Sequence, residues 1–166
     1  MNESNIKQIQ IEVIDILHFW LSEELKWGEV EIEYAEEIAN TINRALSFGG
    51  NLENSIKAAM RSCIEDQGVD WYDFGMLAKH SELTPEVIYE TYLAKYTLNI
   101  FRQNHGYKTG EYKKHWLLPV LSLQFQEDNW FLERALEEIK KEEKEVIIEE
   151  INNRLEYWYG ILEGGK

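Results

Sequence analysis

Apolar residues recur three or four positions apart through most of this 166-residue chain, and this spacing favours a fold of helices packed on helices. The pattern predicts helices over residues 4–25, 32–46, 52–64, 70–79, 85–104, 128–140 and 145–162. Thr84-Pro85 is a helix start signal, with Thr84 as the N-cap. Residues 106–126 have no clear period and are predicted to be loop, and no β-hairpin signal is found. We therefore expect an all-α, single-domain fold.

Bulk properties narrow the class of protein. A chain of this length with 44% hydrophobic residues can bury a sizeable core. It has no run of 18 apolar residues, so we expect no membrane-spanning segment, and its polar N-terminus lacks the features of a signal peptide. Cys63 is the only cysteine, which excludes an intramolecular disulfide and favours a cytoplasmic location.

A cationic segment stands out, because the formal net charge of the chain is -14. The acidic balance argues against binding a nucleic-acid polymer, which needs a basic face. The segment contains Arg102, Lys108, Lys113 and Lys114, interleaved with Tyr107, Tyr112 and Trp116. Gly106 and Gly110 would let its backbone approach a ligand closely. This combination suits a nucleotide, although the composition alone favours a surface loop with a few lysines.

Two carboxylates, Glu12 and Asp15, lie three positions apart on the first predicted helix and so share a face with apolar residues. Carboxylates beside an apolar stripe are costly unless they are neutralised, and Mg²⁺, which prefers oxygen ligands, would neutralise them. Ordinary exposed acids have the same spacing, however, as at Glu33/Glu36 and Asp70/Asp73. Spacing alone therefore leaves both interpretations open.

Two blocks of the sequence resemble a known family. Residues 11–22, Ile-Glu-Val-Ile-Asp-Ile-Leu-His-Phe-Trp-Leu-Ser, resemble the second metal-binding helix of the dimeric all-α dUTPases, which belong with the MazG-type nucleotide pyrophosphohydrolases. Residues 89–116, followed by Glu127-Asp128-Asn129, resemble the phosphate- and nucleotide-binding segment of the same enzymes. The likeness is close over residues 6–24 and 85–136, and elsewhere it is a similar helical pattern.

The resemblance implies an activity and a set of site residues. It implies Mg²⁺-dependent hydrolysis of dUTP and dUDP to dUMP by a homodimer. Glu12 and Asp15 match the catalytic carboxylates that hold the metal, while His18 and Phe19 match positions beside the nucleoside. The positions that close on phosphates, sugar and base are matched by Asn99, Arg102, Tyr107, Lys108, Lys113 and Asn129. Among these, Arg102 could clamp phosphate oxygens with its guanidinium fork. For Tyr112 and Trp116 the alternative is packing that anchors the loop, and for His18 it is a hydrogen-bonded core histidine.

The chain also departs from the family. The family's first carboxylate pair, Glu-x-x-Glu on an upstream helix, is absent, so we expect an N-terminally truncated bundle, either a fragment or a short homologue, with half of the metal cage missing. An apolar insert, Leu117–Gln126, separates the loop from Asn129. These departures leave two hypotheses, an impaired dUTPase and a catalytically inactive homologue that binds a nucleotide or a protein. The two blocks weigh against an unrelated acidic interaction domain.

The expected organisation follows from these matches. Residues 4–104 would form the helical core, residues 106–126 a ligand-binding loop with its insert, and residues 127–163 the C-terminal helices. The helix of residues 4–25 would pack against the helix of residues 85–104.

Overall fold

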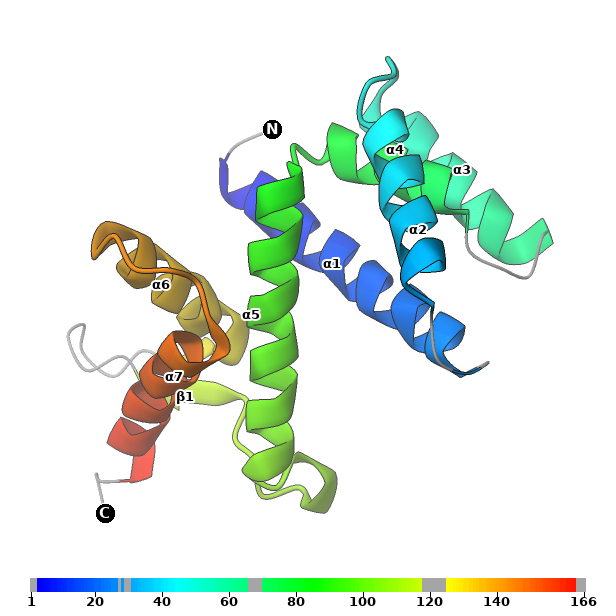
Figure 1. Ribbon diagram of the computed structural model, residues 1–166. Helices are drawn as coiled ribbons and strands as arrows, with labels where there is room; N and C mark the ends of the chain where they lie inside the picture. The colour runs from blue at the N-terminus through cyan, green and yellow to red at the C-terminus, as the bar shows by residue number, and fades with distance from the viewer. Residues whose placement is uncertain (1–2, 27, 29–30, 66–69, 118–124, 164–166) are drawn as a thin grey trace. The chain divides into compact units, whose positions relative to one another are not determined.

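The computed structural model describes residues 3–26, 28, 31–65, 70–117 and 125–163 (Figure 1). The helices are α1 Glu3–Leu25, α2 Ile32–Ala45, α3 Leu52–Glu65, α4 Trp71–His80, α5 Pro85–Asn104, α6 Asp128–Lys141 and α7 Ile148–Glu163. They confirm the predicted all-α class. The chain divides into two compact units, Met1–Tyr92 and Leu93–Lys166, which are described separately below. The assignment of all 166 residues to one domain stays a prediction.

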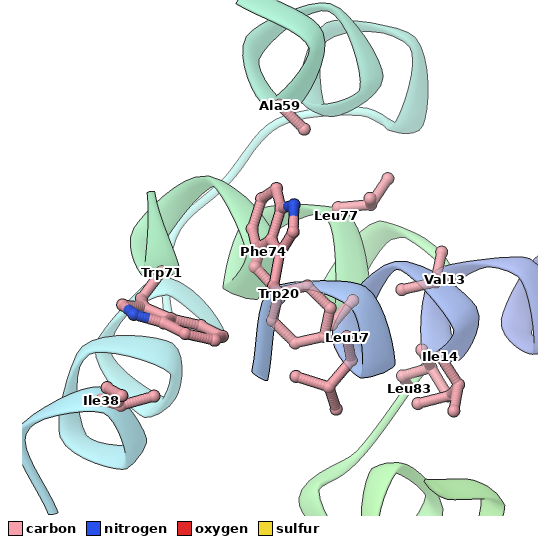
Figure 2. Close-up of a cluster of buried hydrophobic side chains, with 11 residues drawn as sticks. Val13, Ile14, Leu17, Trp20, Ile38, Ala59, Trp71, Phe74, Leu77 and Leu83 are labelled. Carbon is pink, nitrogen blue, oxygen red and sulfur yellow. The ribbon is translucent and has the colours of Figure 1, made fainter. Parts of the chain in front are cut away.

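The core of the first unit is built on aromatic side chains from α1 and α4. Trp20 meets Trp71 edge to face, with ring centroids 5.9 Å apart, and Phe74 lies 5.9 Å from Trp20. Figure 2 shows these rings together with Leu17 and Leu77. The apolar stripe predicted on α1 therefore faces this core, and burial of large side chains supplies most of its stability.

Helices α2 and α4 approach each other closely at Gly75, which is buried. A Cβ at this position would lie 2.6 Å from the Cβ of Ala45 and 2.8 Å from the carbonyl oxygen of Ile42. Real Cβ atoms do not approach other atoms so closely, so only glycine fits between the two helices. The small pair Gly75 and Ala45 thus sets how α2 crosses α4.

The start of α5 belongs to the first unit. The Thr84 hydroxyl accepts a hydrogen bond from the Val87 amide at 3.3 Å, which confirms Thr84 as the N-cap. Val87, Ile88 and Tyr92 pack against the core to which α1 contributes. The ring of Tyr92 stacks on His18, so the part of α5 before Leu93 contacts α1. The packing of the two helices along their full length stays a prediction.

The second unit holds the remainder of α5, a 3-10 turn η1 at Tyr107–Thr109, two short strands, α6 and α7. Phe101, Trp116 and Phe131 are fully buried at its centre. Arg154 of α7 ties the two C-terminal helices together, because it reaches Glu142, which follows α6, at 2.7 Å. It also bonds Glu150 of its own helix at 2.8 Å. α7 begins at Ile148, three residues later than predicted.

The predicted loop of residues 106–126 is wrong in one respect. Strand β1, His115–Leu117, pairs antiparallel with strand β2, Phe125–Glu127, and Trp116 lies opposite Gln126. Strands of three residues are too short to show an alternating pattern, and the burial of Trp116 holds the pair in place. Residues 118–124, the middle of the predicted insert, lie outside the described residues. No helix in the described part of the chain is long and apolar enough to cross a membrane.

We predict opposite effects for the same substitution at two helical glycines. Gly75→Ala should destabilise the protein, by about 1–3 kcal/mol, because the added methyl group collides with α2. Gly160→Ala on α7 meets no atom within 4 Å and should stabilise the protein by about 0.5–1 kcal/mol. Urea unfolding followed by circular dichroism measures both. Stabilisation by Gly75→Ala would contradict the close α2–α4 crossing.

Candidate functional site

Glu12 and Phe19 lie on one face of α1 and line the same groove. The groove has a volume of about 610 Å³ and runs between α1 and α3, with Ile16, Ile56 and Met60 among its lining residues. Glu12 is exposed and accepts a hydrogen bond from Gln8 Nε2 at 2.8 Å, and the Phe19 side chain is 72% exposed. The groove is therefore apolar with a carboxylate at its surface, and its volume suits a small-molecule site.

Asp15 and His18 lie one helical turn apart and are both half-buried. The imidazole of His18 stacks on the ring of Tyr92, with centroids 4.1 Å apart and an interplanar angle of 13°. This contact packs His18 against the first part of α5. Its place beside a nucleoside stays a prediction.

The metal-binding role of Glu12 and Asp15 stays a prediction. No group of three or more His, Cys, Asp or Glu residues able to hold a metal ion exists among the described residues. Mg²⁺ commonly takes only one or two carboxylates and completes its shell with water and substrate phosphates, so the two side chains have suitable chemistry for a nucleotide-bound ion. Asp70 and Asp73, which share the spacing, are structural: Asp70 caps α4 and Asp73 accepts a hydrogen bond from Ser62 at 2.6 Å.

A buried ionic cluster lies in the second unit, and we call Arg102, Tyr112 and Asp128 the Asp128 cluster. Asp128 is fully buried, and its two carboxylate oxygens accept hydrogen bonds from Arg102 Nε and Nη2, both at 2.8 Å. The Tyr112 hydroxyl donates to the same carboxylate at 2.7 Å. The remaining terminal nitrogen of Arg102 donates to Asn99 Oδ1 at 3.2 Å. The guanidinium edge predicted to clamp phosphate thus bonds a carboxylate, and the phosphate role of Arg102 stays a prediction.

The electrostatics of the cluster favour its charged pair and a neutral tyrosine. Burial lowers the pKa of the Arg102 guanidinium, but the hydrogen bonds and charge of Asp128 more than offset this and raise that pKa above its usual value. Burial raises the pKa of Tyr112 well above its usual range, and the negative charge of Asp128 adds to the effect. Tyr112 therefore remains a hydrogen-bond donor at neutral pH.

Two glycines in the left-handed region bound the turn that carries the predicted phosphate ligands. Gly106 has φ +81° and Gly110 has φ +79°, on either side of η1. The side chains of Tyr107, Lys108 and Lys113 are exposed around this turn. Such a turn presents cations and backbone to solvent, as an anion-binding segment requires.

Tyr112 and Trp116 anchor the segment after the turn, as their packing alternative predicted. Tyr112 stacks on Tyr159 with centroids 5.5 Å apart, and buried Trp116 donates its indole hydrogen to the Lys113 carbonyl at 2.7 Å. The Lys113 backbone is therefore fixed while its side chain remains exposed.

Sequence reasoning missed Lys95, which is 2% exposed and reaches Asn129 Oδ1 at 3.4 Å. Lys95, Asn99 and Arg102 are spaced four and three residues apart, so they share one face of α5. That spacing is the feature of the sequence from which Lys95 could have been predicted to lie beside Asn99 and Arg102. The structure thus brings Asn99, Arg102 and Asn129 to one polar layer at the start of α6.

A comparison with known families gives one match. The family model described as dUTPase matches residues 1–107. The match contains Glu12, Asp15, His18, Phe19, Asn99, Arg102 and Tyr107, and it ends before Lys108, Lys113 and Asn129. No curated protein matches the chain.

We predict that the Asp128 cluster makes stability fall at alkaline pH. Because the pKa of Tyr112 is raised in the folded state, the unfolded chain loses this proton first, above about pH 10. The free energy of unfolding should then fall by about 1.4 kcal/mol for each pH unit above that value. Tyr112→Phe should remove this contribution, whereas Tyr157→Phe, at an exposed tyrosine, should keep the wild-type slope. Urea unfolding between pH 8 and about 11 measures the slopes, and equal slopes for wild type and Tyr112→Phe would contradict the assignment.

Proposed function

Because the chain belongs to the dimeric all-α dUTPase family, we propose that it binds dUTP and, with Mg²⁺, hydrolyses dUTP and dUDP to dUMP. The observation that carries the proposal is the family match over residues 1–107, which includes Glu12 and Asp15. We also propose that the protein forms a homodimer, as the family does.

The proposed roles on α1 follow from the chemistry of its side chains. Glu12 and Asp15 would hold Mg²⁺, which when bound polarises phosphate oxygens and lowers the pKa of a coordinated water. Phe19 offers an exposed ring beside Glu12 in the groove, where a nucleoside can pack against it. The half-buried imidazole of His18 is one turn from Asp15 and would orient the same nucleoside.

The proposed roles in the second unit concern the phosphates. Hydrolysis of a phosphoric anhydride builds charge on phosphate oxygens, so placed cations contribute more than covalent chemistry does. Lys108 and Lys113 are exposed and pair with no acid among the described residues, whereas neighbouring Lys114 lies 3.5 Å from Glu127. Their charges are therefore available to a triphosphate. Tyr107, Asn99 and Asn129 would add hydrogen bonds to phosphate, sugar or base.

We expect turnover to be slow. Only two of the proposed site residues are carboxylates, and the described residues provide no third acid beside them. With fewer carboxylates the metal is held less firmly and the attacking water is activated less.

The groove favours a second candidate function, a catalytically inactive relative that binds a nucleotide or a protein. Its lining is apolar apart from Gln8 and Glu12, and Met60 and Ile64 are 58% and 73% exposed. Exposed apolar surface of this kind is common where another molecule binds.

The test is release of pyrophosphate from dUTP with Mg²⁺. We predict slow release by the wild type that requires Mg²⁺ and falls at least about tenfold in Asp15→Asn, because a metal ligand loses its charge. Glu53→Gln on α3, at an exposed acid that pairs with Lys57, is the matched control and should behave as the wild type. Release that is unchanged in Asp15→Asn would remove Asp15 from the site. Tight binding of dUTP without release would favour the second candidate.

A further inference from the structure

We propose that Asp128 is a positioning residue for the nucleotide-binding segment, and that Arg102 acts through Asp128 rather than on a phosphate. The proposal rests on the proposed function and deepens it. It assigns the Asp128 cluster the task of holding Lys113 and Asn129 in place before a nucleotide arrives.

The hydrogen-bond acceptors of the Asp128 carboxylate are already occupied by side chains of this chain. The carboxylate is fully buried and accepts two hydrogen bonds from Arg102 and one from Tyr112. A buried carboxylate is stable only when such partners are kept, so the three side chains are fixed relative to one another. The Arg102 side chain is 15% exposed, and its Nε–Nη2 edge, which matches an oxyanion, is already used.

The Asp128 cluster joins three segments of the second unit. Arg102 comes from the last turn of α5, Tyr112 follows Gly110, and Asp128 is the first residue of α6. The Asp128 amide also donates to the Lys114 carbonyl at 2.9 Å. Lys113 therefore lies between two residues that are both bonded to Asp128.

Asn129 directly follows Asp128 in the first turn of α6. Its side chain faces Lys95 of α5, with Nζ and Oδ1 3.4 Å apart. The Asp128 carboxylate thus fixes the backbone of Asn129, whose side chain is predicted to bind the nucleotide. Ordering these groups in advance lowers the conformational entropy lost on binding, which raises affinity without any direct contact to the ligand.

The test is a double-mutant cycle on affinity, measured by calorimetry with the full chain, Mg²⁺ and the non-hydrolysable analogue α,β-imido-dUTP. Asp128→Asn and Arg102→Lys should each weaken binding about tenfold, since each removes charge-assisted hydrogen bonds. The double variant should bind no more weakly than the weaker single variant, because both changes break one cluster. Losses that multiply to about 100-fold would show that Arg102 contacts the ligand itself and would overturn the proposal.

Two further variants separate positioning from a purely structural role. Tyr112→Phe keeps the ring and removes one hydrogen bond to Asp128, so it should preserve the helical content and weaken binding about threefold. Arg134→Lys alters an exposed ion pair with Glu138 on α6 and should bind as the wild type. Unchanged affinity of a folded Tyr112→Phe variant would overturn the proposal even if Asp128→Asn fails to fold.

The outcomes also separate this proposal from the function on which it rests. If the wild type binds the analogue and the Asp128→Asn variant binds it with the same affinity, the positioning role alone is overturned. A wild type that does not bind the analogue would overturn the proposed function, and the positioning role with it.

Discussion

The second unit depends on a buried carboxylate that has three hydrogen-bond donors. Asp128 is removed from water completely, and without Arg102 and Tyr112 its charge would be unpaired in an apolar core. Its partners come from α5 and from the segment after Gly110, so one side chain joins three parts of the chain. The aromatic core of Phe101, Trp116 and Phe131 packs in the same unit and supplies the burial, while the ionic cluster specifies which backbone segments meet.

Helices were predictable here because their signal is local and repeats. The stripe on α1 and the Thr84 cap placed two helices to within a residue of their observed starts. The pairing of β1 with β2 was not predictable, because three residues are too few to show alternation. In the candidate site, too, only relations between residues that are close in the sequence could be predicted. Glu12 and Asp15 could be placed on one helix from their spacing of three residues, whereas the bond of Arg102 to Asp128 joins residues 26 apart and left no mark in the local pattern.

The two units contribute different chemistry to the proposed function. The first holds the carboxylates and an apolar groove that suits a small ligand. The second holds exposed lysines on a turn bounded by two glycines with positive φ. The dUTPase family match covers the first unit and ends within the turn. The proposed phosphate-binding role of Lys108 and Lys113 therefore rests on the resemblance of residues 89–116 and on the exposure and charge of the two side chains, not on the match.

The central claim is that this chain cleaves dUTP as its family does, between the α- and β-phosphates. Phosphorus NMR of dUTP incubated with the protein and Mg²⁺ identifies the bond that breaks. The account predicts that dUMP and pyrophosphate appear together in equal amounts, and that neither appears when Mg²⁺ is chelated. Formation of dUDP and orthophosphate, or dUTP that stays intact with Mg²⁺ present, would contradict it.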